Sequence, residues 1–245
     1  LAGDHLRAVF QPIVDLASGC VSAAEALARW PMPIPAGDVP ALLEAEGLTA
    51  RFVELLLVAL CEQQHELVRA GLELDLWMRI PCAALSDVAL ADRLAEVVRA
   101  NGADPRRIVW ALGARALRSD APATLHVLTR LRVMGFGLCL DEFGSGSPTL
   151  EQLERIPLTG VRLAAHLVYG AAGDPARVAL LQDAIDAAHG LGLAVVASGC
   201  ESPADFELLL ELGCGHGQGT FIGEPVAASR LASWAAAWDP AEEQR

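Results

Sequence analysis

Apolar residues follow two different spacings along this chain. In short runs almost every residue, or every second one, is apolar, whereas in longer stretches apolar residues recur at intervals of three and four. The short runs predict β-strands and the long stretches predict amphipathic helices. The expected strands are Ala8–Val14, Val21–Leu27, Leu74–Ile80, Ile108–Leu112, Gly137–Asp141, Val161–Leu163, Ala194–Ala197 and a short one near His216–Gly217. The expected helices are Ala50–Ala70, Val88–Ala100, Ala123–Met134, Leu150–Arg155, Ala176–Leu191 and Ala204–Leu212.

The order of these elements predicts the fold. A tight turn at Ala17-Ser18-Gly19 joins the first two strands, so we expect them to form an antiparallel hairpin. Strands and helices then alternate, which is typical of parallel strands with helices packed outside. About eight strands in one uninterrupted series close best as a barrel. The prediction is an α/β fold, a (β/α)8 TIM-like barrel with an antiparallel first strand, in one domain over residues 1–245.

Composition narrows the classes of partner. The hydrophobic fraction of 53% suits one large core. A net charge of −13 argues against binding to nucleic acid, which requires a basic face. A small anionic ligand remains compatible with this charge if a few arginines hold it. The chain contains no lysine, so every fixed side-chain cation is a guanidinium.

Neither a membrane segment nor a secretion signal is visible. No apolar run reaches the roughly 18 residues that cross a bilayer, and the start, LAGDHLRAVF, lacks the regions of a signal peptide. We expect a cytoplasmic domain without membrane contact of its own. The cysteines show no CxxC spacing and lie mostly among apolar residues, which predicts reduced, buried thiols; they are Cys20, Cys61, Cys82, Cys139, Cys200 and Cys214.

Candidate chemistry gathers where the expected strands end, because the loops at this end of a (β/α) barrel carry its sites. The residues at these positions are Glu25, Arg79, Ala111, Asp141, Glu142, Arg162, Ser198 and Gln218. Glu25, Asp141 and Glu142 form an oxygen-rich set that suits Mg²⁺ or Mn²⁺. Acidic residues are also common in surface loops, so this set alone leaves both interpretations open.

A series of ordered motifs decides between them. They are Phe10-Gln11-Pro12-Ile13-Val14, Glu25-Ala26-Leu27-Ala28-Arg29-Trp30, Asp141-Glu142-Phe143-Gly144-Ser145-Gly146, Val195-Val196-Ala197-Ser198-Gly199-Cys200-Glu201 and Gln218-Gly219-Thr220-Phe221. The series resembles the EAL family of cyclic di-GMP phosphodiesterases over about residues 6–237. The resemblance implies the same barrel and a two-metal hydrolysis of a phosphodiester.

The chain departs from the family's catalytic pattern at several positions. The resemblance assigns Glu25 and Asp141 as retained metal carboxylates, and Glu142 as a longer replacement for an aspartate. It places Arg79 at a metal-binding asparagine, Ala111 at a glutamate, Arg162 at a lysine, Ala164 at an aspartate and Ser198 at the proposed general base. Loss of a general base alone typically costs about 10²–10⁴-fold in rate. We expect a degenerate member with no intact catalytic residue and no cofactor, Mg²⁺ or Mn²⁺ being needed only for residual activity.

Ligand-binding positions are better preserved. The resemblance implies contacts to cyclic di-GMP from Gln11, Leu27, Arg29, Asp141, Phe143, Ser145, Glu201, Gln218 and Pro225. Core packing is the alternative role for Leu27 and Phe143. Glu224 stands where the family usually has arginine, and its charge opposes an anionic ligand.

Three functions stay open at this point. The first is a cyclic di-GMP receptor, in which Arg79 replaces the metal as counter-ion of Glu25 and Asp141. In this receptor Arg79 or Arg162 also donates a bidentate pair of hydrogen bonds to a phosphate of the ligand. A salt bridge from Arg79 that merely closes the pocket is the alternative. The second function is a nucleotide-independent protein-interaction module, and the third a weak phosphodiesterase. A protein partner is expected, and the resemblance allows a homodimer.

Overall fold

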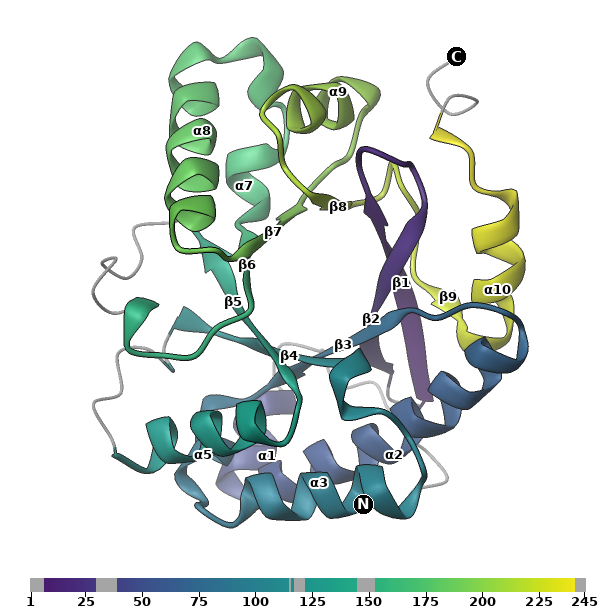
Figure 1. Ribbon diagram of the computed structural model, residues 1–245, viewed down its shortest axis with the longest axis vertical. Coiled ribbons are helices and arrows are strands. Elements are labelled where there is room, and N and C mark those ends of the chain that lie inside the picture. Colours follow the sequence, from purple (N-terminus) through teal and green to yellow (C-terminus); the bar gives the residue numbers. More distant parts are fainter. Residues whose placement is uncertain (1–6, 30–38, 115, 117–121, 145–152, 241–245) are drawn as a thin grey trace.

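The computed structural model describes residues 7–29, 39–114, 116, 122–144 and 153–240. Its central feature is a closed barrel in which neighbouring strands follow the order β2 to β8 and then β1, which pairs back onto β2 (Figure 1). The strands are β1 (Arg7–Asp15), β2 (Val21–Arg29), β3 (Asp75–Ile80), β4 (Ile108–Leu112), β5 (Gly137–Phe143), β6 (Gly160–Leu163), β7 (Ala194–Ser198) and β8 (His216–Gln218). A short strand β9 (Val226–Ala227) pairs with β1. The predicted strands and the predicted fold class are confirmed.

The antiparallel first strand is also confirmed. β1 runs antiparallel to both β2 and β8, while the pairings from β2 to β8 are parallel. The hairpin turn is held by Asp15, whose side chain accepts hydrogen bonds from the Ser18 N–H at 2.8 Å and from the Ser18 hydroxyl at 2.7 Å. Gly19 completes the turn with a φ of 70°, which glycine adopts at no steric cost. We call the end of the barrel where the parallel strands begin the lower end, and the opposite end the upper end.

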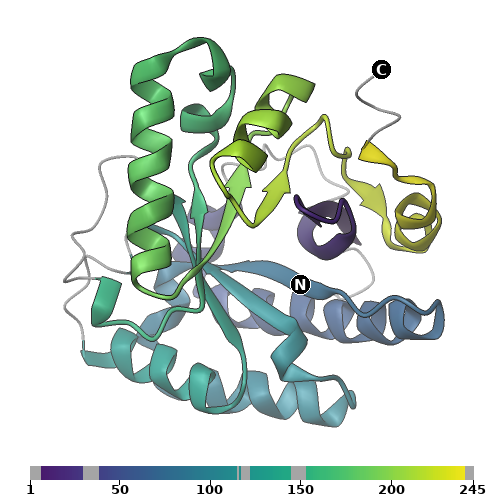
Figure 2. The ribbon, with the colours of Figure 1, turned by 45° about the horizontal axis from the view of Figure 1, so that its top comes forward.

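Helices surround the barrel. They are α1 (Val39–Ala45), α2 (Thr49–Arg69), α3 (Leu90–Ala100), α5 (Pro122–Val133), α7 (Ala165–Val168), α8 (Pro175–Gly190), α9 (Pro203–Glu211) and α10 (Ala228–Ala237). Figure 2 shows α2, α3 and α5 along one side of the sheet, with α8 and α9 on the other. The two larger core clusters follow this division, one built on α2, α3 and α5 and the other on α8 and α9. The first half of the helix predicted over Leu150–Arg155 lies outside the described residues.

The inside of the barrel has two layers with different chemistry. Because side chains alternate across a strand, every second residue of each strand faces the axis. The lower layer is apolar and forms its own cluster of Ile13, Ala23, Trp77, Val109, Cys139 and Val196. The next inward residues, toward the upper end, are mostly polar, and they make up the candidate site.

The cysteines are all free, and most are buried as expected. Cys61, Cys139, Cys200 and Cys214 are buried, while Cys20 is exposed and Cys82 is half-buried. Burial raises the pKa of the Cys61 thiol to about 11, with a smaller contribution from the nearby charge of Glu62. Within the described residues, no helix combines the length and apolar character needed to span a membrane.

Candidate functional site

Arg162 lies at the centre of the upper layer, and its guanidinium donates hydrogen bonds to three neighbouring side chains. Its Nη1 donates to Glu25 Oε2 at 2.6 Å and to Gln218 Oε1 at 3.1 Å, and its Nη2 donates to Glu25 Oε1 at 3.1 Å and to Asp141 Oδ2 at 2.9 Å. The Nε donates to Asp141 Oδ1 at 2.8 Å. The five N–H groups of a guanidinium therefore meet five acceptors. Gln218 closes the ring by donating to Glu25 Oε2 at 3.0 Å.

The members of this ring are deeply buried. The exposed fractions are 7% for Glu25, 4% for Asp141, 3% for Arg162 and 3% for Gln218. Burial alone would raise the pKa of Asp141, but hydrogen bonds from Arg162 and the charges of Arg162 and Arg79 outweigh it and hold this pKa below its usual value. Burial alone would lower the pKa of Arg162, but its two carboxylate partners raise it. Arg162 thus balances one of the two carboxylate charges in the ring, and Arg79, which contacts Asp141 from outside, supplies the second cation.

Arg79 occupies a different position from Arg162. Its Nη2 donates to Asp141 Oδ2 at 2.5 Å, yet 58% of its side chain is exposed. The sequence-based hypothesis made Arg79 the counter-ion of both Glu25 and Asp141. The structure corrects this: Arg162 is the shared counter-ion, and among the described residues Arg79 pairs with Asp141 and not with Glu25. Arg162 lies between the two carboxylates because it enters from β6, across the barrel from β2, whereas Arg79 enters from β3 beside β2.

Glu142 lies apart from this cluster. The β5–β6 register shifts between Leu140 and Phe143, and Glu142 sits in that irregularity with a φ of 59°, a left-handed conformation rare for a non-glycine residue. Its side chain is exposed, and its backbone N–H donates to Asp141 Oδ1 at 3.0 Å. The expected set of Glu25, Asp141 and Glu142 is therefore not gathered around one point.

The donors at this site do not fit a divalent metal ion. All four carboxylate oxygens of Glu25 and Asp141 accept hydrogen bonds from Arg162, so a cation between them would have to displace a guanidinium. Ala111, buried on β4, offers no oxygen ligand from its side chain. Within the described residues, no group of three or more His, Cys, Asp and Glu is placed to hold a metal ion.

A pocket opens beside the cluster at the upper end. Its volume is about 430 Å³, within the usual range for small-molecule sites. The charged part of its lining is Glu25, Arg29 and Arg79. The apolar part comes from β2, α1, α2 and the end of β3: Ala26, Leu27, Ala28, Val39, Pro40, Leu43, Phe52, Leu56 and Pro81. The pocket thus combines two guanidinium groups with an apolar wall.

Glu201 and Ser198 lie at the end of β7. Ser198 is half-buried at the strand end, paired with Gln218 on β8, and Glu201 is exposed in the following loop. The loop is held by Asp205, which the sequence analysis did not single out. Asp205 is 1% exposed and accepts hydrogen bonds from the Glu201 N–H at 3.1 Å and from the Gly170 N–H at 2.9 Å. The signal was present in the Ser202–Asp205 spacing, which resembles a helix capping box.

The remaining predicted positions are placed as follows. The Gln11 amide donates to the Gly223 carbonyl at 3.2 Å, which ties β1 to the loop before β9. Phe143 is 7% exposed and belongs to the core cluster on the α8 and α9 side, as its packing alternative predicted. Pro225 is half-buried. Ser145 lies outside the described residues.

Comparison with known proteins relates this site to a family. A model of the EAL domain matches residues 1–225. A cyclic di-GMP phosphodiesterase of Pseudomonas aeruginosa is 30% identical over 237 residues, covering 95% of this chain and 40% of that protein. The cyclic di-GMP phosphodiesterase RocR of the same organism is 27% identical over 230 residues, covering 92% of this chain and 59% of RocR. The chain therefore spans only part of the length of these relatives.

Solved structures agree with the fold. The PaMucR phosphodiesterase, solved in complex with c-di-GMP, superposes with a TM-score of 0.84 at 28% identity, covering 93% of this chain and 99% of that one. The FimX EAL domain of Xanthomonas citri, also in complex with c-di-GMP, gives a TM-score of 0.80 at 18% identity, covering 92% and 89%, and shows likeness of fold alone. With its barrel, its ordered motifs and a family match over most of its length, this chain belongs to the EAL domain family.

Proposed function

We propose that this chain is a catalytically inactive EAL domain that binds cyclic di-GMP without metal and acts as a receptor in second-messenger signalling. The observation that carries the proposal is the ring around Arg162. A single buried guanidinium satisfies every carboxylate oxygen of Glu25 and Asp141, which the resemblance assigns to metal binding. The Arg162 guanidinium therefore occupies the position where hydrolysis would need a bound metal ion.

Loss of hydrolysis rests on more than the metal. The position of the general base is Ser198, whose hydroxyl, unlike a carboxylate, cannot accept a proton from water at neutral pH unless another base activates it. General-base loss typically costs about 10²–10⁴-fold, and metal activation of water supplies a further several kcal/mol that this site lacks. The combined losses put turnover far below that of an intact phosphodiesterase.

Retention of the ligand rests on the pocket beside the ring. Cyclic di-GMP carries two phosphodiesters, and Arg29 and Arg79 both line this pocket. Arg79 makes one contact, to Asp141, which Arg162 also holds with two hydrogen bonds. Arg79 can therefore turn to a phosphate without leaving Asp141 unpaired. The apolar wall along α1 and α2 suits a guanine base, and the related PaMucR structure contains the same nucleotide.

Titration calorimetry with cyclic di-GMP in EDTA tests the receptor. We expect saturable binding with a dissociation constant in the micromolar range or below. Arg79→Met should weaken it about tenfold or more, because a charge-assisted contact to phosphate is lost. Arg99→Met is the matched control, since among the described residues Arg99 pairs with Glu96 alone, on the exposed face of α3. Absence of binding by the wild-type chain rejects the receptor.

Incubation with cyclic di-GMP and Mg²⁺ or Mn²⁺ tests the loss of hydrolysis. We expect no linear dinucleotide above the no-protein control. Metal-dependent product from the wild-type chain that disappears in Glu25→Gln would instead establish a weak phosphodiesterase.

A nucleotide-independent interaction module is the second candidate. It is favoured by Glu224, which is exposed in the loop before β9 and adds a negative charge where the family usually has arginine. Glu224→Arg separates the two functions: a receptor should bind cyclic di-GMP more tightly in this variant, whereas an interaction module should show no binding in either form. A protein partner and a homodimer are part of both proposals. Light scattering of the chain with and without nucleotide tests the homodimer.

A further inference from the structure

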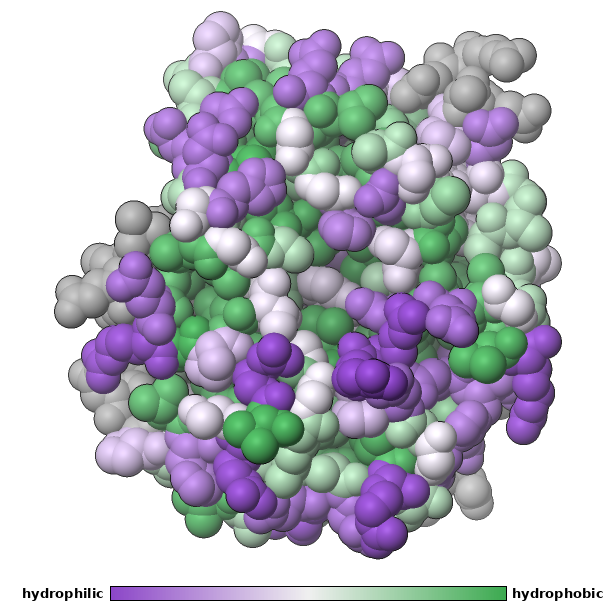
Figure 3. All heavy atoms as spheres, in the orientation of Figure 1, coloured by the Kyte–Doolittle hydropathy of each residue, from purple (hydrophilic) through white to green (hydrophobic). Residues whose placement is uncertain are grey.

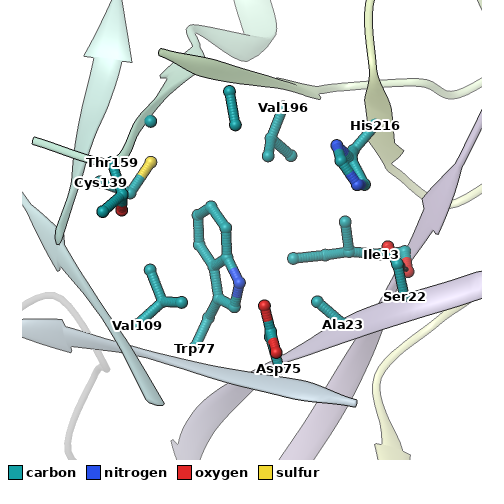
Figure 4. Close-up of a pocket in the computed structure, with 12 residues that line it drawn as sticks. Ile13, Ser22, Ala23, Asp75, Trp77, Val109, Cys139, Thr159, Val196 and His216 are labelled. Atoms are coloured by element: carbon teal, nitrogen blue, oxygen red, sulfur yellow. Dashed lines mark hydrogen bonds between the residues drawn. The ribbon is translucent and has the colours of Figure 1, made fainter. Parts of the chain in front are cut away.

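The lower end of the barrel contains a second cavity, separate from the candidate site. Its volume is about 190 Å³. The lining comes from the lower layer and the strand starts around it: Ile13, Ser22, Ala23, Asp75, Trp77, Val109, Cys139, Thr159, Gly160, Ala194, Val196 and His216. Figure 4 shows the Trp77 indole in the middle of this ring of side chains. Trp77 also separates the two sites, because the Arg162 Cζ lies 5.9 Å from the centre of its ring on the other side.

The cavity exists because three strands carry a small residue at the inward-facing position nearest the lower end. Ala23, Gly160 and Ala194 leave open the space that larger side chains fill in the lower layer of an ordinary (β/α) barrel. Gly160 is enforced by the fold: a Cβ there would lie 2.8 Å from the Ala194 carbonyl oxygen. The opening is therefore built into the β6–β7 pairing and is no accident of one side-chain rotamer.

Polar groups at the cavity do not satisfy one another. No hydrogen bond joins two of the side chains drawn in Figure 4. The buried His216 Nδ1 has no hydrogen-bond partner within the part of the chain that the structure describes. Asp75 Oδ1 accepts from Arg107 Nη1 at 3.2 Å, but Arg107 is shared with Glu73 at 2.9 Å. The Ser22 and Thr159 hydroxyls already donate to the carbonyl oxygens of Ile13 and Leu138. Buried polar groups in folded proteins normally have partners, so the His216 Nδ1 is the group that an occupant of this cavity would satisfy.

The charges around the opening select the sign of that occupant. Glu73 and Asp75 lie on one side with only Arg107 between them, and Asp15 lies opposite His216 in the β1–β8 pairing. Of these three carboxylates, Asp75 lines the cavity itself; Glu73 lies outside it and shares Arg107, and Asp15 accepts hydrogen bonds from Ser18 in the hairpin turn. In Figure 3, which shows this end of the molecule, green and white spheres surround the centre and strongly hydrophilic ones gather below and to its right.

We propose that the lower cavity binds a small aromatic cation, one ring bearing an ammonium or amidinium group. The ring would stack in the slot between the Trp77 indole and the aliphatic walls, since a cavity of about 150 Å³ already accepts benzene in another protein. The cationic group would reach Asp75 at the opening. This site does not depend on nucleotide binding at the upper end.

Benzylamine is a suitable probe, and the Trp77 indole N–H is a suitable reporter. The chain has five tryptophans, so Trp77→Phe identifies the Trp77 signal in a ¹H–¹⁵N spectrum. We expect benzylamine to shift this signal saturably at high micromolar to millimolar concentration. Benzoate, which has the same shape and the opposite charge, should leave it unchanged. No saturable shift with benzylamine, or an equal response to benzoate, overturns the proposal.

Two pairs of variants test whether benzylamine binds in the lower cavity. Ala23→Leu fills the cavity and should abolish the shift, and Ala23→Val gives a smaller filling if the leucine variant does not fold. Asp75→Asn should weaken benzylamine about threefold, as for a partly exposed ion pair, whereas Glu73→Gln, which neutralises a carboxylate that does not line the cavity, should change it less. Undiminished binding in a folded Ala23 variant would show that the probe binds elsewhere.

Discussion

At the scale of single residues, the main result is that Arg162 and Arg79 have different roles. Both stand where the resemblance implies other residues, but only Arg162 is buried within the ring. The difference between lysine and arginine is decisive here. A lysine offers three donors from one point, whereas the flat guanidinium offers five in a fixed fork. One arginine can therefore hold two carboxylates and an amide at once, and no metal is needed to keep them together.

Arg162→Met tests how strongly the ring depends on this one cation. The change leaves Glu25 and Asp141 buried, and Arg79, on Asp141, is then their one cationic contact within the described part of the chain. Removal of one partner from a buried ion pair typically costs about 3–5 kcal/mol, and we expect a loss of this size in the free energy of unfolding measured in urea. Arg99→Met, at an exposed pair on α3, should cost less than about 1 kcal/mol. Equal losses would mean that the ring contributes no more than a surface pair.

Asp141 predicts a pH dependence with a definite sign. Its pKa in the folded chain lies below the ordinary value of 3.8. A carboxylate of this kind stabilises the fold at pH values above its unfolded pKa, and the contribution is lost as pH falls through the lower folded pKa. The difference in unfolding free energy between wild type and Asp141→Asn should therefore be full at pH 5–7 and shrink below about pH 4. A difference that stays constant from pH 7 to pH 3 contradicts this account.

At the scale of elements, the strands follow directly from the apolar pattern, and the departures occur where a local contact overrides it. The short helices α1 and α7 were not expected, because such short segments contain too few turns for a periodicity to appear. β5 extends past Asp141 to Phe143 through an irregularity at Glu142. That irregularity separates two adjacent acidic residues, one buried and one exposed, which residue type alone could not distinguish.

The loop between β7 and α9 depends on one buried carboxylate. Asp205 joins this loop to the turn after α7 through the Glu201 and Gly170 N–H groups. Asp205→Ala should cost about 1–3 kcal/mol in unfolding free energy, because buried donors lose their acceptor. It should also raise amide hydrogen exchange at Glu201 and Gly170 specifically. Asp186→Ala, at an exposed contact with Gln182, is the control, and unchanged exchange at both amides would exclude this role for Asp205.

At the scale of the whole molecule, closure of the barrel brings residues far apart in sequence into one ring. Glu25 and Gln218 are separated by 193 positions and share a hydrogen bond of 3.0 Å. The resemblance implied that Gln218 contacts the ligand. Its amide instead finds Glu25 and Arg162 across the barrel, so it belongs to the ring.

Thermal unfolding reports on ligand and metal together. If the receptor proposal holds, cyclic di-GMP at about 100 times its dissociation constant should stabilise the fold by about 2.7 kcal/mol in EDTA. For a chain of this size that corresponds to a rise of roughly 5–10 °C in Tm. Mn²⁺ without nucleotide should raise Tm by less than about 1 °C, because its expected ligands are already paired. A large rise in Tm with Mn²⁺ alone would contradict the conclusion that Arg162 takes the place of a metal ion between Glu25 and Asp141.

The sequence by itself determined the barrel, its antiparallel first strand and the residues that stand at the upper strand ends. These follow from apolar periodicity, turn residues and ordered motifs, all of which are local along the chain. The extent of the domain over the whole chain, and the ligand contacts at the upper end, stay predictions. Only the tertiary structure decided which arginine holds the carboxylates, that Glu142 stands apart, and that Gln218 is already paired. Those outcomes depend on distances across the barrel. Alternation along one strand indicates which side chains face the axis, but not which of them meet there.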